Sequence, residues 1–309
     1  MNKKIVIVTG TGGMLGTGHF QRMVNLVVAI NKENNLNAKI FLGHNKYNNE
    51  HGLPERLRHI LTEDIPPDTD LIIRDMRDSS TDEIENLKKT APVLTIDDLG
   101  EGKNSADHAL YLLPAPLEAS KDIRLSNNLF LYGYNFMTGI ESLRERDFIK
   151  DIDLAIYLGS DPDKELISRI KKSIPKNLSA IVLAAGKAIT LTGQIKTDDI
   201  QYAEILCRSK ILLTHFGITM FEGHICGCRI AALNPSQYHS ALTATVYDDL
   251  NILYLSDYAA FNADEMFNII DKNLKIIDDK VIAVDNIQKE INTKNKNFVE
   301  YIKKILYER

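Results

Sequence analysis

The opening of the chain constrains its fold more strongly than any other segment. Residues 4–8 (KIVIV) form a short apolar run rich in β-branched side chains, which predicts a buried strand. Five glycines follow between residues 10 and 18, and an apolar segment over residues 23–30 continues at helical length. A strand, a glycine-dense turn and a helix place bare backbone N–H groups at a helix N-terminus, where they can bind an anion. The opening therefore predicts an α/β fold with a ligand site beside its first strand.

The glycine spacing differs from the fingerprint of dinucleotide-binding proteins. Gly10 and Gly12 are followed by Leu15, where the fingerprint has a third glycine or alanine. The second strand, predicted over residues 38–42, is not followed by the acidic residue that binds the ribose in such proteins. NAD binding is therefore not expected, and the sequence predicts no cofactor. A turn that only lets the helix pack close to the sheet is the structural alternative.

Composition excludes several classes of protein. The net charge of −5 gives no general attraction to nucleic acid or to an anionic membrane. No apolar run approaches the roughly 20 residues that span a bilayer, and no signal peptide is expected. The three cysteines are an odd number and favour a reducing, cytoplasmic location. Cys226-x-Cys228 with nearby His224 fits no standard zinc spacing, so buried thiols are expected instead of a metal site.

Short apolar strands alternate with helices along the chain. Strands are predicted at residues 4–8, 38–42, 70–74, 93–96, 109–113 and 129–132, and again at 153–158, 180–184, 189–193, 211–214, 229–233 and 252–255. A polar connection over residues 139–150 separates the two series. Alternation of this kind predicts parallel sheets covered by helices. We therefore expect two α/β domains, residues 1–145 and 150–309.

Candidate functional side chains gather where the first-half strands end. Ligands of parallel sheets bind at the carboxyl ends of the strands, where the chain places Asp75, Asp97 and Asp98. His19 and Arg22 are three residues apart at the start of the first helix, so both can face one pocket. An imidazole can accept a proton near neutral pH, which makes His19 the first catalytic candidate and helix capping its structural alternative. Arg22 suits either a diphosphate contact or a salt bridge.

Five motifs, in one order along nearly the whole chain, resemble those of a known family. The motifs are residues 16–22 (GTGHFQR), 95–99 (TIDDL), 130–134 with 143–144 (FLYGY and LR), 158–162 (LGSDP) and 217–222 (GITMFE). They are similar to motifs of the UDP-sugar hydrolases of pseudaminic acid synthesis, the PseG/SpsG family, which is kin to MurG-type glycosyltransferases. The resemblance implies a GT-B type fold, in which two Rossmann-like parallel-sheet domains face a central cleft. It also implies that the last helix, residues 286–307, packs back on the first domain.

The resemblance implies roles for individual residues. His19 is the expected base, and Asp98, within residues 95–99, is a further catalytic candidate. Asp75 lies outside the five motifs and is a catalytic candidate because of its place at a strand end, where a carboxylate can orient water or simply end the strand. The expected substrate contacts are Gly16, Gly18 and Arg22 in the first domain and Gly217, Thr219, Glu222, Gln237 and His239 in the second. Glu222 is expected at the ribose, and Gly217 and Thr219 at the phosphates, where a helix begins.

The resemblance implies a function and leaves two alternatives. The first reading is hydrolysis of a UDP-sugar at its anomeric carbon, with release of UDP, in surface-glycan or pseudaminic-type sugar biosynthesis. The first alternative is a GT-B glycosyltransferase that uses a nucleotide-sugar donor. Residues 213–219 (LTHFGIT) depart from the glycine-rich loop of the family, and this keeps a second alternative, an inactive nucleotide-sugar binding protein.

Overall fold

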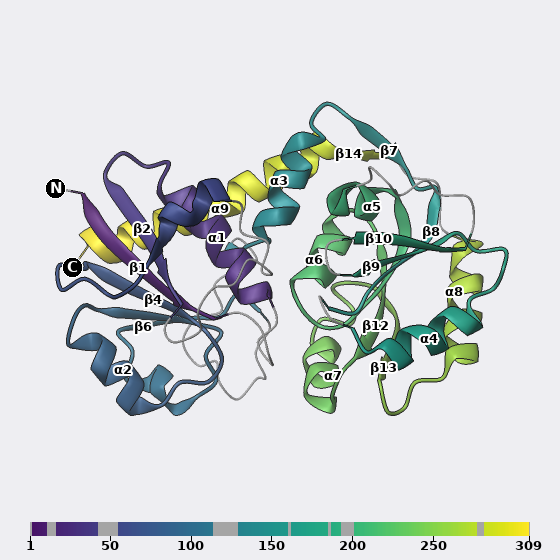
Figure 1. The fold of residues 1–309 in the computed structure, drawn as a ribbon, viewed down its shortest axis with the longest axis horizontal. Coiled ribbons are helices and arrows are strands. Elements are labelled where there is room, and N and C mark those ends of the chain that lie inside the picture. Colours follow the sequence, from purple (N-terminus) through teal and green to yellow (C-terminus); the bar gives the residue numbers. More distant parts are fainter. Residues whose placement is uncertain are drawn as a thin grey trace. The chain divides into compact units, whose positions relative to one another are not determined.

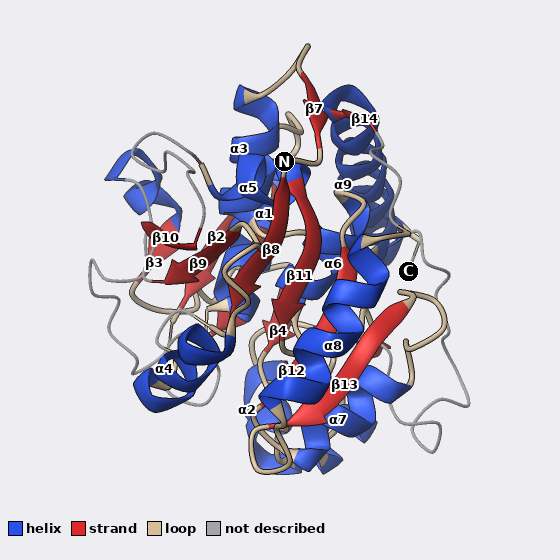
Figure 2. Ribbon diagram, turned by 90° about the vertical axis from the view of Figure 1, so that its right-hand side faces the viewer, coloured by secondary structure: helices blue, strands red, loops and turns tan. Residues whose placement is uncertain are grey.

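A computed structural model describes residues 2–10, 17–42, 55–113, 129–159, 162–184, 187–192, 201–276 and 281–308. The protein is an α/β structure in which two six-stranded sheets carry helices on their faces (Figures 1 and 2). The chain divides into two compact units, Met1–Tyr134 with Glu290–Arg309 and Asn135–Lys289. The last helix, α9 (Val284–Tyr307), thus begins in the second unit and continues in the first.

The first sheet is parallel throughout and has the order β3-β2-β1-β4-β5-β6. Its strands are β1 (Lys3–Thr9), β2 (Leu36–Phe41), β3 (Leu61–Thr62), β4 (Leu71–Asp75), β5 (Val93–Ile96) and β6 (His108–Leu110). The strand order reverses between β1 and β4. Crevices at such a switch point, beside the carboxyl ends of the strands, are where open α/β sheets bind ligands.

Buried polar contacts join α1 (Gly18–Ile30) to α9 within the first unit. Asn25 donates its side-chain amide to Asn295 Oδ1 at 3.2 Å, and Asn295 donates in return to Asn25 Oδ1 at 3.0 Å. Asn25 also donates to the carbonyl of Tyr132 at 2.9 Å. Since buried amides are stable only when hydrogen-bonded, these contacts fix how the second half of α9 packs.

The second sheet has the order β10-β9-β8-β11-β12-β13 and reverses between β8 and β11. Its strands are β8 (Ile152–Tyr157), β9 (Ala180–Ala184), β10 (Lys187–Thr192), β11 (Ser209–Thr214), β12 (Arg229–Asn234) and β13 (Ile252–Asp257). All neighbours pair in parallel except β9 and β10, which pair antiparallel. Only two residues separate β9 from β10, and a parallel crossover needs about a dozen. The expectation of a parallel strand at this edge was therefore wrong.

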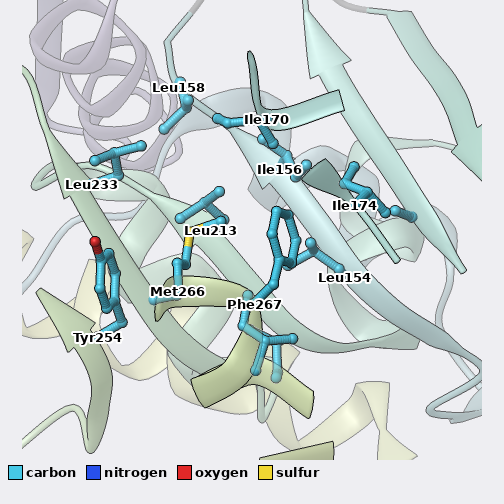
Figure 3. Packing of buried hydrophobic residues seen from close by; sticks show 14 of the residues in the cluster. Leu154, Ile156, Leu158, Ile170, Ile174, Leu213, Leu233, Tyr254, Met266 and Phe267 are labelled. Atoms are coloured by element: carbon cyan, nitrogen blue, oxygen red, sulfur yellow. The ribbon is translucent and has the colours of Figure 1, made fainter. Parts of the chain in front are cut away.

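Helices α4 (Lys164–Ser173) and α8 (Ala263–Leu274) pack on one face of the second sheet. Figure 3 shows strand residues Leu154, Ile156, Leu213 and Leu233 with Ile170 of α4 and with Met266 and Phe267 of α8. The unit also contains α3 (Tyr134–Ser142), α5 (Tyr202–Arg208), α6 (Ile218–Ile225), α7 (Gln237–Ala244) and an antiparallel pair, β7 (Asp147–Ile149) and β14 (Val281–Ala283). This buried apolar layer holds the strands whose carboxyl ends carry the candidate site.

Several secondary-structure expectations were wrong. Residues 129–132 form no strand, although all four are buried. Their apolar character serves packing in the first unit, where the carbonyl of Tyr132 accepts the bond from Asn25. The polar connection expected over residues 139–150 contains the end of α3 and strand β7. A 3-10 helix, η3 (Glu55–Ile60), leads into β3, and α7 follows β12.

Across the described residues, no helix is both long and apolar enough to cross a membrane.

Candidate functional site

The first part of the candidate site lies at the switch point between β1 and β4. His19 is the second residue of α1, and Asp75 is the last residue of β4. The His19 Nδ1 atom lies 2.8 Å from Asp75 Oδ1. The Thr9 hydroxyl, at the end of β1, donates to the Asp75 carbonyl at 2.9 Å. The topology thus joins a helix start and two strand ends around one imidazole–carboxylate pair.

Asp75 is fully buried and remains ionised. Burial by itself raises the pKa of Asp75, but Arg22 and then His19 outweigh burial and lower that pKa to about 2. The Arg22 side chain donates to both carboxylate oxygens, from Nε at 2.7 Å and from Nη2 at 2.5 Å. Because an ionised carboxylate only accepts hydrogen bonds, Nδ1 of His19 is the donor in the pair. In the neutral imidazole, this arrangement leaves the lone pair on Nε2, where it can accept a proton.

Arg22 is enclosed by carboxylates. Its Nη1 atom lies 2.7 Å from Asp97 Oδ2, in addition to the two bonds with Asp75, and the side chain is almost fully buried. Burial lowers the pKa of Arg22, whereas the charges of Asp75 and Asp97 raise it further than burial lowers it. The guanidinium of Arg22 therefore pairs with carboxylates of its own unit. This geometry does not support the diphosphate contact expected from the sequence.

The adjacent residues Asp97 and Asp98 have different surroundings. The Asp98 side chain accepts hydrogen bonds from the Ser79 and Gly100 amides at 3.0 and 2.9 Å, and from the Ser79 hydroxyl and Arg74 at 2.5 and 3.3 Å. A buried carboxylate with four donors holds a loop in place, so the geometry favours a structural role for Asp98 over the catalytic role expected from the sequence. Asp97, in contrast, reaches Arg22.

The second part of the candidate site lies at the switch point between β8 and β11. The loop after β11 leads into α6, and its last residue, Gly217, has φ 158° and ψ −178°, which side-chain-bearing residues rarely adopt. In the helix that follows, Glu222 is only 3% exposed. The Tyr202 hydroxyl, from α5, donates to Glu222 Oε2 at 2.6 Å and lies 3.1 Å from Thr219 Oγ1.

Tyr202 stays protonated and sets the direction of these hydrogen bonds. Burial, together with the neighbouring Glu222 and Tyr157, raises the pKa of Tyr202 well above its usual value. Since its single proton goes to the Glu222 carboxylate, the Thr219 hydroxyl is the donor in the remaining contact. Sequence analysis missed Tyr202, because its contact with Glu222 spans 20 residues and joins two helices.

His215 follows β11 and is neutral at physiological pH. Burial lowers the pKa of His215, and the hydrogen bond to the Phe216 carbonyl, with Nδ1 at 2.8 Å, opposes burial only in part. Because a carbonyl only accepts, Nδ1 carries the proton and Nε2 carries the lone pair. The ring lies against two glycines: a Cβ atom on Gly159 would be 3.5 Å from Nε2, and one on Gly217 would be 3.7 Å from Cε1.

The remaining expected site residues fall elsewhere. Gln237 and His239 lie in the first turn of α7, which follows β12, and the imidazole of His239 contacts the capping hydroxyl of Ser236 at 2.8 Å. Gly18 is the first residue of α1, and Gly16 lies outside the described residues. The structure therefore joins His19 with Asp75 and Arg22, and Thr219 with Glu222 through Tyr202.

The cysteines form a buried cluster with a lysine. Cys207 and Cys226 approach to 3.7 Å between their Sγ atoms, and Cys228 is buried beside them. The Lys150 ammonium donates to the carbonyls of Ser209 and Cys226, at 2.6 Å each. Within the part of the chain that the structure describes, no group of His, Cys, Asp and Glu side chains is arranged to hold a metal ion.

Comparison with solved structures finds glycosyltransferases and a putative epimerase of similar fold. The glycosyltransferase SnogD from Streptomyces nogalater aligns at TM-score 0.51 and 11% identity, over 99% of this chain and 100% of that chain. A putative UDP-N-acetylglucosamine 2-epimerase from Listeria monocytogenes aligns at TM-score 0.53 and 11% identity, over 100% and 98%. UGT71G1 from Medicago truncatula, in complex with UDP-glucose, aligns at TM-score 0.50 and 9% identity, over 99% and 98%.

These structural similarities establish the fold of the chain. Neither a scan against protein-family models nor a search of curated protein sequences found a match to this chain. The structural matches extend over nearly the whole length of both partners, which a single shared Rossmann-like domain could not produce. The α/β fold expected from the sequence, with two Rossmann-like sheets in a GT-B arrangement of the chain, is confirmed.

Proposed function

We propose that this chain is an enzyme that takes a nucleotide-activated sugar as donor and transfers the sugar to a hydroxyl group. The observation that carries the proposal is the His19–Asp75 pair at the switch point of the first sheet. The proton on Nδ1 and the ionised Asp75 give His19 the arrangement of a general base. The full-length likeness to glycosyltransferases such as SnogD supports transfer as the reaction.

The proposed chemistry takes place at the anomeric carbon. The acceptor hydroxyl gives its proton to Nε2 of His19 as its oxygen attacks that carbon. The bond between the anomeric carbon and the phosphate oxygen breaks, and the nucleoside diphosphate leaves with the bonding electrons. Asp75 then stabilises the imidazolium through the bond at Nδ1. Arg22 keeps Asp75 ionised and fixed, since it donates to both oxygens of the carboxylate.

We assign nucleotide binding to the second unit. The bare backbone at Gly217 and the start of α6 suit a diphosphate, and the lone pair on Nε2 of His215 can accept a hydrogen bond from a ribose hydroxyl group. Glu222, held through Oε2 by Tyr202, is the proposed acceptor of ribose hydroxyl groups. UDP is the proposed nucleotide, because UGT71G1 is in complex with UDP-glucose and the Listeria protein is described as a UDP-N-acetylglucosamine 2-epimerase.

Hydrolysis of a UDP-sugar is the second candidate. Its support is the resemblance of residues 16–22 and 95–99 to motifs of the PseG/SpsG hydrolases. In this reaction water takes the place of the acceptor hydroxyl, and the same Nε2 atom accepts its proton. The product is the free sugar, which would serve surface-glycan or pseudaminic-type sugar biosynthesis.

Product analysis tests the proposal. The full chain is incubated with UDP-glucose and UDP-N-acetylglucosamine, with and without a panel of hydroxyl acceptors. Release of UDP that requires an acceptor and forms a glycoside supports transfer. If UDP and free sugar are released in the absence of an acceptor, the reaction is hydrolysis and not transfer. If the sugar is altered while still attached to UDP, the reaction is epimerisation and not transfer. Binding of UDP without any turnover would leave a nucleotide-sugar binding protein and overturn the enzyme assignment.

A further inference from the structure

We infer that Asp97 is a positioning residue for His19, and that it acts through Arg22 and Asp75. This inference rests on the proposed role of His19 as the base. Asp97 follows β5, two strands away from β1, and reaches His19 only through the guanidinium. Sequence analysis placed Asp97 only at a strand end and assigned no function to it.

An unbroken series of short contacts joins Asp97 to the imidazole. Asp97 Oδ2 lies 2.7 Å from Nη1 of Arg22, and Nη2 and Nε of the same guanidinium bond to the two oxygens of Asp75. Asp75 Oδ1 then accepts the bond from Nδ1 of His19 at 2.8 Å. The guanidinium donates two hydrogen bonds to Asp75 and meets Asp97 as an ion pair without hydrogen-bond geometry, so the two carboxylates hold the cation from both sides. The position of the cation sets the orientation of Asp75 and, through Asp75, of the imidazole.

Asp97 is itself held firmly. Its Oδ1 atom accepts backbone hydrogen bonds from Leu112 at 2.7 Å and Leu113 at 3.0 Å, and its own amide donates to the Leu110 carbonyl at 2.9 Å. Asp97 has φ of 50°, in the left-handed region that few residues other than glycine occupy. An aspartate in a strained backbone conformation, with one oxygen fixed and the other on a buried cation, fits a positioning function.

The charges around His19 give the contact network a second consequence. Asp75 and Asp97 are negative and Arg22 is positive, so these three groups together carry one negative charge beside the imidazole. Nearby Tyr111 adds no charge near neutral pH, because burial and the charges of Asp98 and Asp97 raise its pKa. Removing the charge of Asp97 brings the sum to zero, which disfavours the imidazolium that forms when His19 accepts a proton.

The test uses the full-chain variant Asp97→Asn, with Asp107→Asn as its matched control. Asp107 makes the same type of backbone contact, to the Val93 amide at 2.9 Å, but at the amino end of β5. We expect the ¹⁵N resonances of the His19 ring, identified by their loss in His19→Asn, to change in Asp97→Asn, because the ring loses its fixed hydrogen bond with Asp75. We also expect kcat to fall about tenfold with KM little changed.

Unchanged His19 resonances and kcat in folded Asp97→Asn, or equal changes in Asp107→Asn, would overturn the inference. If Asp97→Asn does not fold, the variant Arg22→Lys tests the inference instead. The lysine ammonium keeps the positive charge but cannot bridge both carboxylates, so kcat should fall about tenfold. Wild-type kcat in Arg22→Lys would overturn the inference. Because the ring resonances are recorded without substrate, they also separate the two proposals. Changed His19 resonances in Asp97→Asn together with full turnover in His19→Asn would refute the proposed base and leave the coupling intact.

Discussion

The two parts of the candidate site lie at equivalent switch points and differ in the groups that donate to their buried carboxylates. In the first unit, the charged side chains of Asp75, Arg22 and Asp97 pair with one another beside His19. In the second unit, the buried Glu222 carboxylate accepts a hydrogen bond from the Tyr202 hydroxyl, and Gly217 presents bare backbone beside the neutral imidazole of His215. Buried charges are stable only when paired, so the first cluster is organised before any ligand binds. The second cluster is suited to a ligand that brings its own charge.

The largest effect is expected at the base. His19→Asn keeps the size of the side chain and loses the basic Nε2 atom, and general bases contribute about 10²–10⁴-fold to rate. We expect kcat to fall by that factor while UDP affinity stays near the wild-type value, measured by steady-state kinetics and by calorimetry. The same substitution at His59, an exposed residue of η3, is the control. Loss of UDP affinity with normal turnover would show that His19 binds the nucleotide and is not the base. The proposed division of roles between the two units would then be wrong.

The next effect concerns stability and distinguishes paired charges from neutral groups. Arg22→Met leaves two buried carboxylates facing each other without their cation, and breaking a buried ion pair in this way costs about 3–5 kcal/mol. Tyr202→Phe removes one neutral donor from Glu222 and should cost about 1–3 kcal/mol. Urea unfolding of both variants measures the difference. Equal losses in the two variants would show that the two clusters do not differ as their charges suggest.

A third effect tests the nucleotide assignment. Glu222→Ala removes the proposed ribose acceptor, and a lost hydrogen bond to a charged group is worth about 1.5–3 kcal/mol. The dissociation constant for UDP, measured by calorimetry, should therefore rise about tenfold or more. Glu204→Ala is the control, because Glu204 is paired with Arg208 on α5. Unchanged UDP affinity in a folded Glu222→Ala protein would contradict the assignment.

Local sequence patterns predicted the parts of the fold that depend on local structure. The alternation of short apolar runs with helices gave the α/β class, because a parallel strand buried on both faces is apolar throughout. The edge strand β10 and the buried segment 129–132 were misjudged, since pairing direction and packing partners depend on distant residues. For β10 the two-residue connection to β9 was a usable signal, because a link of that length allows only a hairpin.

The candidate site was predictable where a residue type and a strand end coincide. His19 follows the glycine turn, and Asp75 ends a buried strand, so both were identified and the structure joins them. The partnership of Asp97 with Arg22 was not predictable, because Asp97 and Asp98 are adjacent and chemically alike. Only the backbone conformation, with Asp97 at φ 50°, turns one carboxylate toward the guanidinium and the other toward Ser79.

The smallest predicted effect is a difference in acid sensitivity between the two units. Burial lowers the pKa of His215, so the unfolded chain binds more protons than the folded protein once the pH falls below about 6.5. His215 therefore contributes to the free energy of unfolding. This contribution is fully present above about pH 6.5 and is lost as the pH decreases toward the lowered pKa of His215 in the folded state. The pKa of Asp75 is also lowered, to about 2, but from 3.8, so the first unit keeps that contribution until the pH falls below about 4.

Between pH 7.5 and 5.5, protonation of His215 in the unfolded chain should therefore weaken the second unit, whereas Asp75 stays ionised in both states and should not change the stability of the first unit. Hydrogen exchange at the two pH values, corrected for the intrinsic rate, reports the opening free energies of β11 and β4 separately. In His215→Gln, which cannot titrate in this range, the pH dependence at β11 should be reduced while that at β4 stays as in the wild type. A pH dependence at β11 that persists unchanged in His215→Gln would show that another group titrates there. An equal loss of protection at β4 and β11 would show that the acid response does not separate the two units.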